Sequence, residues 1–282
     1  MPGTITPIDF HGQPALQLRT RAGASAIVTP FGGQVLSWAP AGGKERLYLS
    51  DQAVFDGRSA IRGGVPVCFP QFATLGALPR HGLVRTRPWA VVDQRCGDDY
   101  ALVTLRITDD TDTRALWPHA FSLELSVAIE ESRLDLELEA TNTGDAPFAF
   151  TAALHSYLRV GEVEECRLEG LYGLSYRDRA RGDTLTRDSG DALLIDDETD
   201  RIYFNTTRPL LLREYERSLG INAEGFPDTV VWNPWEPGAA ALADLPDNGF
   251  RRMLCVEAAV VGEPIRLDPG AHWWGRQSLV AL

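Results

Sequence analysis

The chain has 282 residues, of which 44% are apolar, and a formal net charge of −12. An apolar fraction of this size can form a substantial core, and we expect a single domain over residues 1–282. The acidic balance argues against general binding to nucleic acid or to anionic membranes, since both depend on broad positive fields.

Nine short segments have the composition and alternation of β-strands. In chain order they are residues 26–29, 34–38, 101–107, 123–129, 134–140, 148–158, 209–215, 229–232 and 253–258. Alternation of apolar and polar residues is clearest in 123–129 and 134–140, which predict a hairpin around a polar turn. The acidic stretch 187–201 is expected to be an exposed loop.

The chain contains 26 Gly and 18 Pro, and no segment has the pattern of an amphipathic helix longer than about three turns. Many short strands without alternating helices favour packed antiparallel sheets over a βαβ fold. We therefore predict an all-β protein built as a large antiparallel β-sandwich.

The cysteines and the N-terminus indicate a reduced, cytoplasmic compartment. Cys68, Cys96, Cys166 and Cys255 are far apart and form no Cys-x-x-Cys pair, which argues against a zinc knuckle or a redox motif. The first residues have no basic segment followed by an apolar one, and no later run is long enough to cross a bilayer. We expect an unprocessed protein without membrane association.

Residues 57–92 contain no Asp or Glu, although the chain has 39 carboxylates. The same window holds several cationic or titratable side chains: Arg58, Arg62, Arg80, His81, Arg85 and Arg87. Guanidinium binds phosphate and carboxylate through parallel hydrogen bonds, and a neighbouring carboxylate would compete for them. Because Lys44 is the only lysine, arginine is the usual cation here, so both a small-anion site and a solvated basic surface remain open.

Two titratable residues lie inside apolar runs. His155 follows Thr-Ala-Ala-Leu and Glu257 follows Leu-Cys-Val, so both are expected to be buried. A buried histidine is often a satisfied core residue, whereas a buried carboxylate must be paired, protonated or turned toward a cavity. Together the two residues suggest an acid–base couple around a bound ligand.

Other chemistries have weaker signals. The chain has no His-x-His, His-x-x-x-His or Gly-x-Ser-x-Gly spacing, which argues against a metal centre and a serine nucleophile. The Trp-Asn-Pro-Trp string at 232–235 and the pair at 273–274 fit either a hydrophobic core or a sugar-stacking surface, with Asn233 or Asp228 bonding hydroxyls.

Taken in order, five strings resemble the glucose-6-phosphate 1-epimerases, also called hexose-6-phosphate mutarotases. They are Ile-Arg-Gly-Gly-Val-Pro-Val-Cys-Phe-Pro-Gln-Phe from 61, Pro-Arg-His-Gly-Leu-Val-Arg from 79, Leu-His-Ser-Tyr-Leu from 154, Asp-Thr-Val-Val-Trp-Asn-Pro-Trp from 228, and Cys-Val-Glu from 255. That family belongs to the aldose 1-epimerase-like group, whose fold is the galactose mutarotase-like supersandwich.

The resemblance implies a role for each matched residue. Glu257 would be the general base on the C1 hydroxyl and His155 the acid on the ring oxygen, while Arg62 and Arg85 would hold the phosphate. Contacts to the substrate are also implied for His81, Asp200 and Gln71. The implied ligand is a small sugar phosphate handled by a monomer, without metal or organic cofactor.

The sequence departs from the family pattern beside the site, where Ala73 replaces a usual glycine and Ala258 a usual proline. Three alternatives stay open: a mutarotase of unphosphorylated aldoses, a non-catalytic sugar-phosphate-binding protein, and a glycoside hydrolase that uses Glu257 with Asp200.

Overall fold

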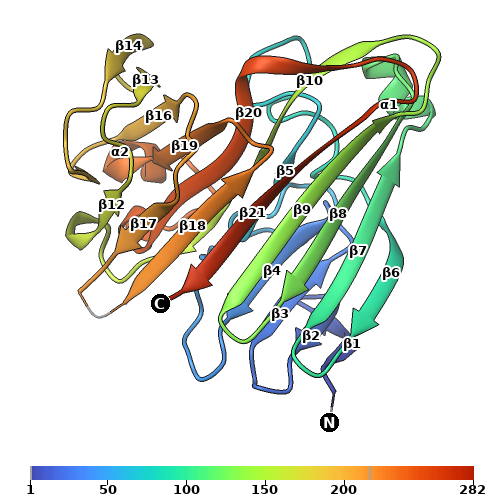
Figure 1. The fold of residues 1–282 in the computed structure, drawn as a ribbon, viewed down its shortest axis with the longest axis horizontal. Coiled ribbons are helices and arrows are strands. Elements are labelled where there is room, and N and C mark those ends of the chain that lie inside the picture. The colour runs from blue at the N-terminus through green and yellow to red at the C-terminus, as the bar shows by residue number, and fades with distance from the viewer. Residues whose placement is uncertain (1, 216) are drawn as a thin grey trace.

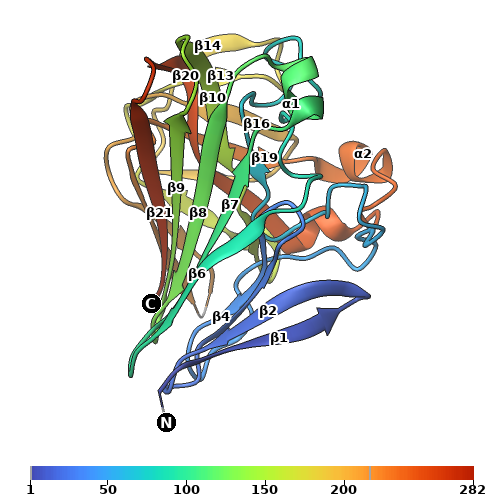
Figure 2. The same cartoon turned by 90° about the vertical axis from the view of Figure 1, so that its right-hand side faces the viewer.

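The computed structural model describes residues 2–215 and 217–282, which form three antiparallel sheets. The predicted all-β sandwich is confirmed. The N-terminal sheet has four strands in sequential order, and it lies at the end of the molecule away from β13 and β14 (Figures 1 and 2). Its strands are β1 (Thr4–Phe10), β2 (Gln13–Arg19), β3 (Ser25–Thr29) and β4 (Gln34–Ala39).

The second sheet has nine strands, and its long members lie side by side in Figure 1. In spatial order they are β15 (Ala192–Leu194), β12 (Arg167–Glu169), β17 (Leu210–Arg213), β18 (Ser218–Glu224), β21 (His272–Ala281), β9 (Arg133–Asn142), β8 (Phe121–Ile129), β7 (Ala101–Thr108) and β6 (Ala90–Cys96). The predicted hairpin is β8 and β9, whose apolar residues are buried on one face while polar residues occupy the other.

The third sheet has eight strands and carries the candidate site. In spatial order they are β14 (Thr184–Arg187), β13 (Ser175–Asp178), β16 (Thr199–Tyr203), β19 (Asp228–Asn233), β20 (Met253–Leu267), β10 (Phe148–Leu154) and β5 (Val67–Cys68), with β11 (Tyr157–Arg159) also paired to β20. Val256, Ala258 and Val260 of β20 belong to the main core, whereas Ala259 lies in a separate apolar cluster. Alternation along β20 therefore places Glu257 on the same side as Ala259.

Helices are short in the described part of the chain: α1 (Thr111–Leu116), α2 (Trp235–Ala240) and 3₁₀ turns at Val163–Glu165 and Gly249–Arg252. Asp110 caps α1 by accepting a hydrogen bond from the backbone N–H of Thr113. Among the described residues no helix has the length and apolar character needed to span a membrane.

The predicted single strand 148–158 is wrong at its centre. It is divided into β10 and β11 with His155 and Ser156 between them, although the register on β20 is the same on both sides of this gap, since Leu154 pairs with Ala258 and Tyr157 with Cys255. The strand predicted at 253–258 is also too short, since β20 continues to Leu267 and pairs with β10 beyond a register shift. The interruption between β10 and β11 is local, and it leaves His155 opposite Glu257 of β20.

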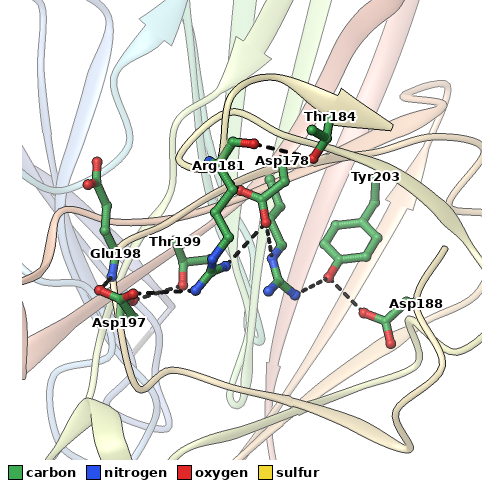
Figure 3. Close-up of polar contacts among 9 residues, drawn as sticks. Asp178, Arg181, Thr184, Asp188, Asp197, Glu198, Thr199 and Tyr203 are labelled. Carbon is green, nitrogen blue, oxygen red and sulfur yellow. Dashed lines mark hydrogen bonds and ion pairs between the residues drawn. The ribbon is translucent and has the colours of Figure 1, made fainter. Parts of the chain in front are cut away.

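The expectation of an exposed loop at 187–201 is wrong as well. This stretch includes β15 and the start of β16, and Asp188 is buried, where it accepts a hydrogen bond from Tyr203 Oη (2.8 Å). Some carboxylates here pair with arginines while remaining exposed to solvent, including Asp197 with Arg181 (Figure 3). Acidic composition alone does not distinguish a solvated loop from a braced edge of a sheet.

Candidate active site

A cavity of about 250 Å³ opens on the outer face of the eight-stranded sheet. The row of cross-strand neighbours Glu257 (β20), Val230 (β19) and Ile202 (β16) runs along this face. The structure brings together six of the seven predicted site residues at this cavity. Its lining consists of Arg62, Phe72, Ala73, Arg80, His81, Arg85, His155, Arg179, Asp200, Val230, Trp232, Leu242 and Glu257.

His155 and Glu257 face each other at the bottom of the cavity, with 3.4 Å between His155 Nδ1 and Glu257 Oε1. Both side chains are almost fully buried. Tyr157 stacks on the His155 ring at 4.8 Å between centroids, and Trp232 meets it edge to face. Within the described residues, His155 Nδ1 and Glu257 Oε2 have no hydrogen-bond partner. The packing holds the imidazole in place and leaves polar atoms free.

Burial drives the pKa values of the two groups toward their neutral forms. It lowers the pKa of His155, with further lowering by His81, Arg62 and Arg85. Burial also raises the pKa of Glu257, and Asp200 raises it further, while Arg179 and Arg80 act in the opposite direction. In both groups burial therefore favours the neutral form, the free imidazole of His155 and the protonated carboxyl group of Glu257. The couple has one proton that can move between its members.

His81 lies beside His155, with 5.3 Å between ring centroids. Its Nδ1 accepts a hydrogen bond from the backbone N–H of Ala73 (3.3 Å) and lies 3.1 Å from the Cys68 sulfur. Burial and then the neighbouring arginines lower the pKa of His81 to about 3, so it is neutral at physiological pH. Ala73 has φ +47°, so the left-handed backbone that favours glycine persists without glycine.

Arg62 is held by two partners. Its Nε donates to Asp244 Oδ1 at 3.1 Å, its Nη2 forms an ion pair with the same oxygen at 3.1 Å, and its Nη1 donates to the Tyr157 hydroxyl at 3.0 Å. Asp244 follows α2, and its own carbonyl accepts a hydrogen bond from Ser50 Oγ. The contacts with Asp244 and Tyr157 therefore fix the orientation of the Arg62 guanidinium in the cavity.

Arg80 and Arg85 differ from Arg62 in their charge balance. Arg85 Nη2 donates to the carbonyl of Arg80 (3.0 Å), and within the described residues neither arginine has a carboxylate at ion-pair distance. Arg179 lies 3.9 Å from Asp200 and donates its backbone N–H to the Asp200 carbonyl. The positive charge without a partner is therefore concentrated on Arg80 and Arg85.

A polar network braces the strands that present Arg179 and Asp200 (Figure 3). Asp178, at the end of β13, accepts a hydrogen bond from Arg181 Nη1 (3.2 Å) and pairs with Arg201 on β16 (3.5 Å). The Arg201 guanidinium also contacts the Tyr203 hydroxyl, which donates to Asp188. These contacts join β13 to β16 on either side of the two cavity residues.

Gln71 is the predicted site residue that does not line the cavity. Its amide donates to the carbonyls of Ala73 (3.1 Å) and Leu78 (3.0 Å), and its Oε1 accepts from the N–H of Leu78 (2.9 Å). Gln71 therefore shapes the loop that carries Arg80 and His81.

The sugar-bonding roles suggested for Asn233 and Asp228 are not supported. Asn233 donates to the carbonyls of Phe250 and Met253, and Asp228 accepts from the N–H groups of Val261 and Gly262. Trp273 packs on Phe150 and Phe226, so it belongs to the core. Of these aromatic residues, only Trp232 lines the cavity.

Sequence reasoning did not identify Arg179, Phe72 and Leu242 as lining residues. Arg179 lies in an arginine-rich and acid-rich stretch, and no local pattern distinguishes it from Arg177 or Arg181. One further grouping bears on metals: ligand atoms of His155, Cys255 and Glu257 lie within 4.8 Å of one another.

The sequence matches the Aldose 1-epimerase family over residues 14–279. It is 37% identical over 275 residues to a protein of Cenchrus ciliaris named "Putative glucose-6-phosphate 1-epimerase", with 94% of this chain and 84% of the relative covered. An Escherichia coli (strain K12) protein of the same name is 32% identical over 242 residues, covering 82% of this chain and 78% of that protein.

Among solved structures, one described as a "putative mutarotase" from Salmonella typhimurium has a TM-score of 0.91 at 27% identity, covering 98% of this chain and 93% of that one. Galactose 1-epimerase from Lactobacillus acidophilus has a TM-score of 0.74 at 18% identity, with 99% and 98% covered, and shares the fold. The family match spans nearly the whole sequence, and the chain belongs to the aldose 1-epimerase family.

Proposed function

We propose that the protein interconverts the α and β anomers of a hexose 6-phosphate, with glucose 6-phosphate as the first candidate. The observation that carries this proposal is a buried acid–base couple, His155 and Glu257, in a cavity that is also lined by arginines. The names of the relatives agree with a phosphorylated sugar as substrate. An enzyme for free aldoses would have no need for uncompensated arginines at its site.

The reaction needs only proton transfers. In the reacting form the proton of the couple has moved from Glu257 to His155 Nδ1, so the Glu257 carboxylate can take the proton of the C1 hydroxyl through its unpartnered Oε2. His155 then gives a proton to the ring oxygen as the C1–O5 bond breaks. The product is the open-chain aldehyde. Rotation about the C1–C2 bond presents the other face of the carbonyl, and the reverse transfers close the ring. His155 Nδ1 faces Glu257, which leaves Nε2 for the substrate.

The distribution of charge supports one orientation of the sugar. Arg62 and Arg85 are the arginines that act on the pKa of His155, whereas Arg179 and Arg80 act on that of Glu257. A sugar with its ring oxygen at His155 has C6 on the same side, so its phosphate would meet Arg62 and Arg85. The C1 and C2 hydroxyls would then lie toward Glu257, Asp200 and Arg179.

The phosphate would also tune the acid. Because Arg62 and Arg85 hold down the pKa of the free His155 imidazole, a phosphate dianion bound to them would offset their charge. Protonation of His155 would then become easier when the correct substrate is present. In this proposal the phosphate contributes to turnover as well as to binding.

Anomer exchange followed by NMR tests the proposal. Glucose 6-phosphate, glucose and galactose are compared at catalytic concentrations of wild type, His155→Ala and Glu257→Gln. The expected result is acceleration for the phosphorylated sugar alone, with a loss of about 10²-fold or more in each variant. Acceleration of the free sugars would assign the protein to aldoses, and no acceleration of any sugar would favour a binding protein.

A further inference from the structure

Three different metal-ligand atoms converge beside the cavity. They are His155 Nδ1, the Cys255 sulfur and a Glu257 carboxylate oxygen, which all lie within 4.8 Å of one another in buried surroundings. Cys255 and Glu257 are two residues apart on β20, so their side chains leave the same side of the strand. His155 reaches them from the interruption between β10 and β11.

The polar atoms of this cluster are incompletely satisfied. Among the described residues, His155 Nδ1 and Glu257 Oε2 have no hydrogen-bond partner although both are buried. Buried polar atoms normally have partners, and an unpaired group indicates a bound species or a catalytic role. The acid–base role accounts for His155 and Glu257, but it does not use the Cys255 thiol.

We propose that His155, Cys255 and Glu257 form a site for a thiophilic divalent metal ion such as Zn²⁺, which would occupy the acid–base couple and block it. Zinc accepts imidazole nitrogen, thiolate sulfur and carboxylate oxygen at about 2.0–2.3 Å, so the ligand atoms need to move inward by about an ångström. Magnesium and calcium prefer oxygen ligands and do not match this set. As the Zn–S and Zn–O bonds form, the thiol and the carboxyl group release their protons to solvent.

The arginines of the cavity oppose this ion without excluding it. Arg62 is paired with Asp244 and Arg179 lies beside Asp200, so part of their charge is compensated. The thiolate and the carboxylate add two negative charges that balance a divalent ion. Arg80 and Arg85 remain repulsive, which predicts that an anion bound to them strengthens metal binding.

Metal binding is measured directly on metal-free protein by equilibrium dialysis with Zn²⁺. The expected result is one ion per chain, which Mg²⁺ does not displace, and at least a tenfold loss of affinity in Cys255→Ser and in Glu257→Gln. Cys166→Ser is the matched control, since this buried cysteine donates to Glu162 O outside the cavity. Unchanged zinc affinity in Cys255→Ser would overturn the proposal.

Cobalt gives a second readout that does not depend on activity. Co²⁺ bound to a thiolate has a charge-transfer absorption, which is expected in wild type and Cys166→Ser and absent in Cys255→Ser. If Cys255→Ser does not fold, Cys255→Ala replaces it, and if neither folds the wild-type cobalt spectrum decides. A wild-type spectrum without the thiolate band contradicts the site.

The claim that the metal blocks the couple rests on the proposed function, whereas the binding claim does not. Zinc is therefore added to wild type during anomer exchange, and each variant is compared with its own metal-free rate. Inhibition that a chelator reverses and that Cys255→Ser lacks is expected. Zinc binding without inhibition of an active enzyme would overturn the blocking claim, whereas zinc binding to a protein without anomerase activity would overturn the proposed function alone.

Discussion

Two nitrogens of Arg62 lie 3.1 Å from one and the same oxygen of Asp244: Nε donates a hydrogen bond to it, and Nη2 forms an ion pair with it. The second carboxylate oxygen takes no part in these two contacts. A third nitrogen donates to Tyr157, whose ring stacks on His155. Asp244 therefore sets the position of an arginine that is linked through Tyr157 to the acid–base couple, although Asp244 does not line the cavity.

Replacement of Asp244 tests this positioning role. In Asp244→Ala the Arg62 side chain becomes free to move, and we expect KM for the sugar phosphate to rise roughly tenfold, or about 1.4 kcal/mol, with little change in kcat. Asp244→Asn keeps an oxygen that can accept both hydrogen bonds and is expected to lie close to wild type. Steady-state anomer-exchange kinetics distinguish the two variants.

Asp247→Ala is the control, since this exposed carboxylate lies on the same segment. In an Arg62→Ala background, Asp244→Ala should add no further loss, because the two residues act as one unit. Additive losses in this double-mutant cycle would contradict the positioning role.

The two arginines Arg85 and Arg87 provide a matched test of the phosphate site. Arg85 lines the cavity, whereas Arg87 pairs with Asp110 and lies outside it. Arg85→Ala is expected to weaken binding of glucose 6-phosphate by about 2 kcal/mol, roughly thirtyfold, because a charge-assisted contact is lost. Arg87→Ala should leave affinity unchanged in isothermal titration calorimetry. Equal effects of the two substitutions would rule out a specific phosphate contact at Arg85.

His81 makes the free energy of unfolding depend on pH. Its folded pKa is about 3, below an unfolded value of about 6.5, so between these values the unfolded chain binds the additional proton. The contribution of neutral His81 is complete above pH 6.5 and decreases as pH falls, by up to about 1.4 kcal/mol per pH unit.

Urea unfolding of wild type and His81→Gln at pH 7, 6 and 5 measures this contribution. The variant is expected to lose less stability between pH 7 and pH 5 than wild type. Because His155 also has a lowered pKa, the variant should retain part of the slope. Parallel pH dependences of the two proteins would show that His81 does not titrate as described.

Gln71 is expected to act through the loop it supports. Gln71→Ala removes the hydrogen bonds to the partly buried N–H and carbonyl of Leu78 and one of those to the Ala73 carbonyl, which keeps its bond from the His81 N–H. We expect a loss of about 1–3 kcal/mol in stability, measured by urea unfolding, together with a raised KM because Arg80 and His81 follow this loop. Gln94→Ala on β6 is a control for loss of a glutamine. A normal fold stability with a raised KM would instead indicate direct contact between Gln71 and substrate.

The sequence predicted the sandwich because its strands obey simple alternation. In β8 and β9 one face is buried and the other is not, and their predicted segments fall within the observed strands. Alternation was less informative in β20, because its apolar run is buried on both faces. The sequence therefore did not predict that the strand continues to Leu267. The two-residue interruption at His155 leaves the register on β20 unchanged, and no local pattern in the sequence marks it.

At the site, burial of His155 and Glu257 was predictable because each lies among apolar neighbours. The acid-free window marked three of the four arginines of the cavity lining. Arg179 was not predictable because its place depends on pairing of β13 with β16, which the sequence did not reveal. Gln71 was predicted as a substrate contact because it belongs to a family motif, but its hydrogen bonds support the neighbouring loop.

The couple is held by neighbouring segments of one sheet, with Glu257 on β20 and His155 between β10 and β11. β10 and β11 pair with β20 on both sides of His155, so the distance to Glu257 follows from strand spacing. In the proposed reaction the opened aldehyde turns about C1–C2 inside a cavity of about 250 Å³, so the steric freedom of the substrate would limit how bulky a sugar can turn over.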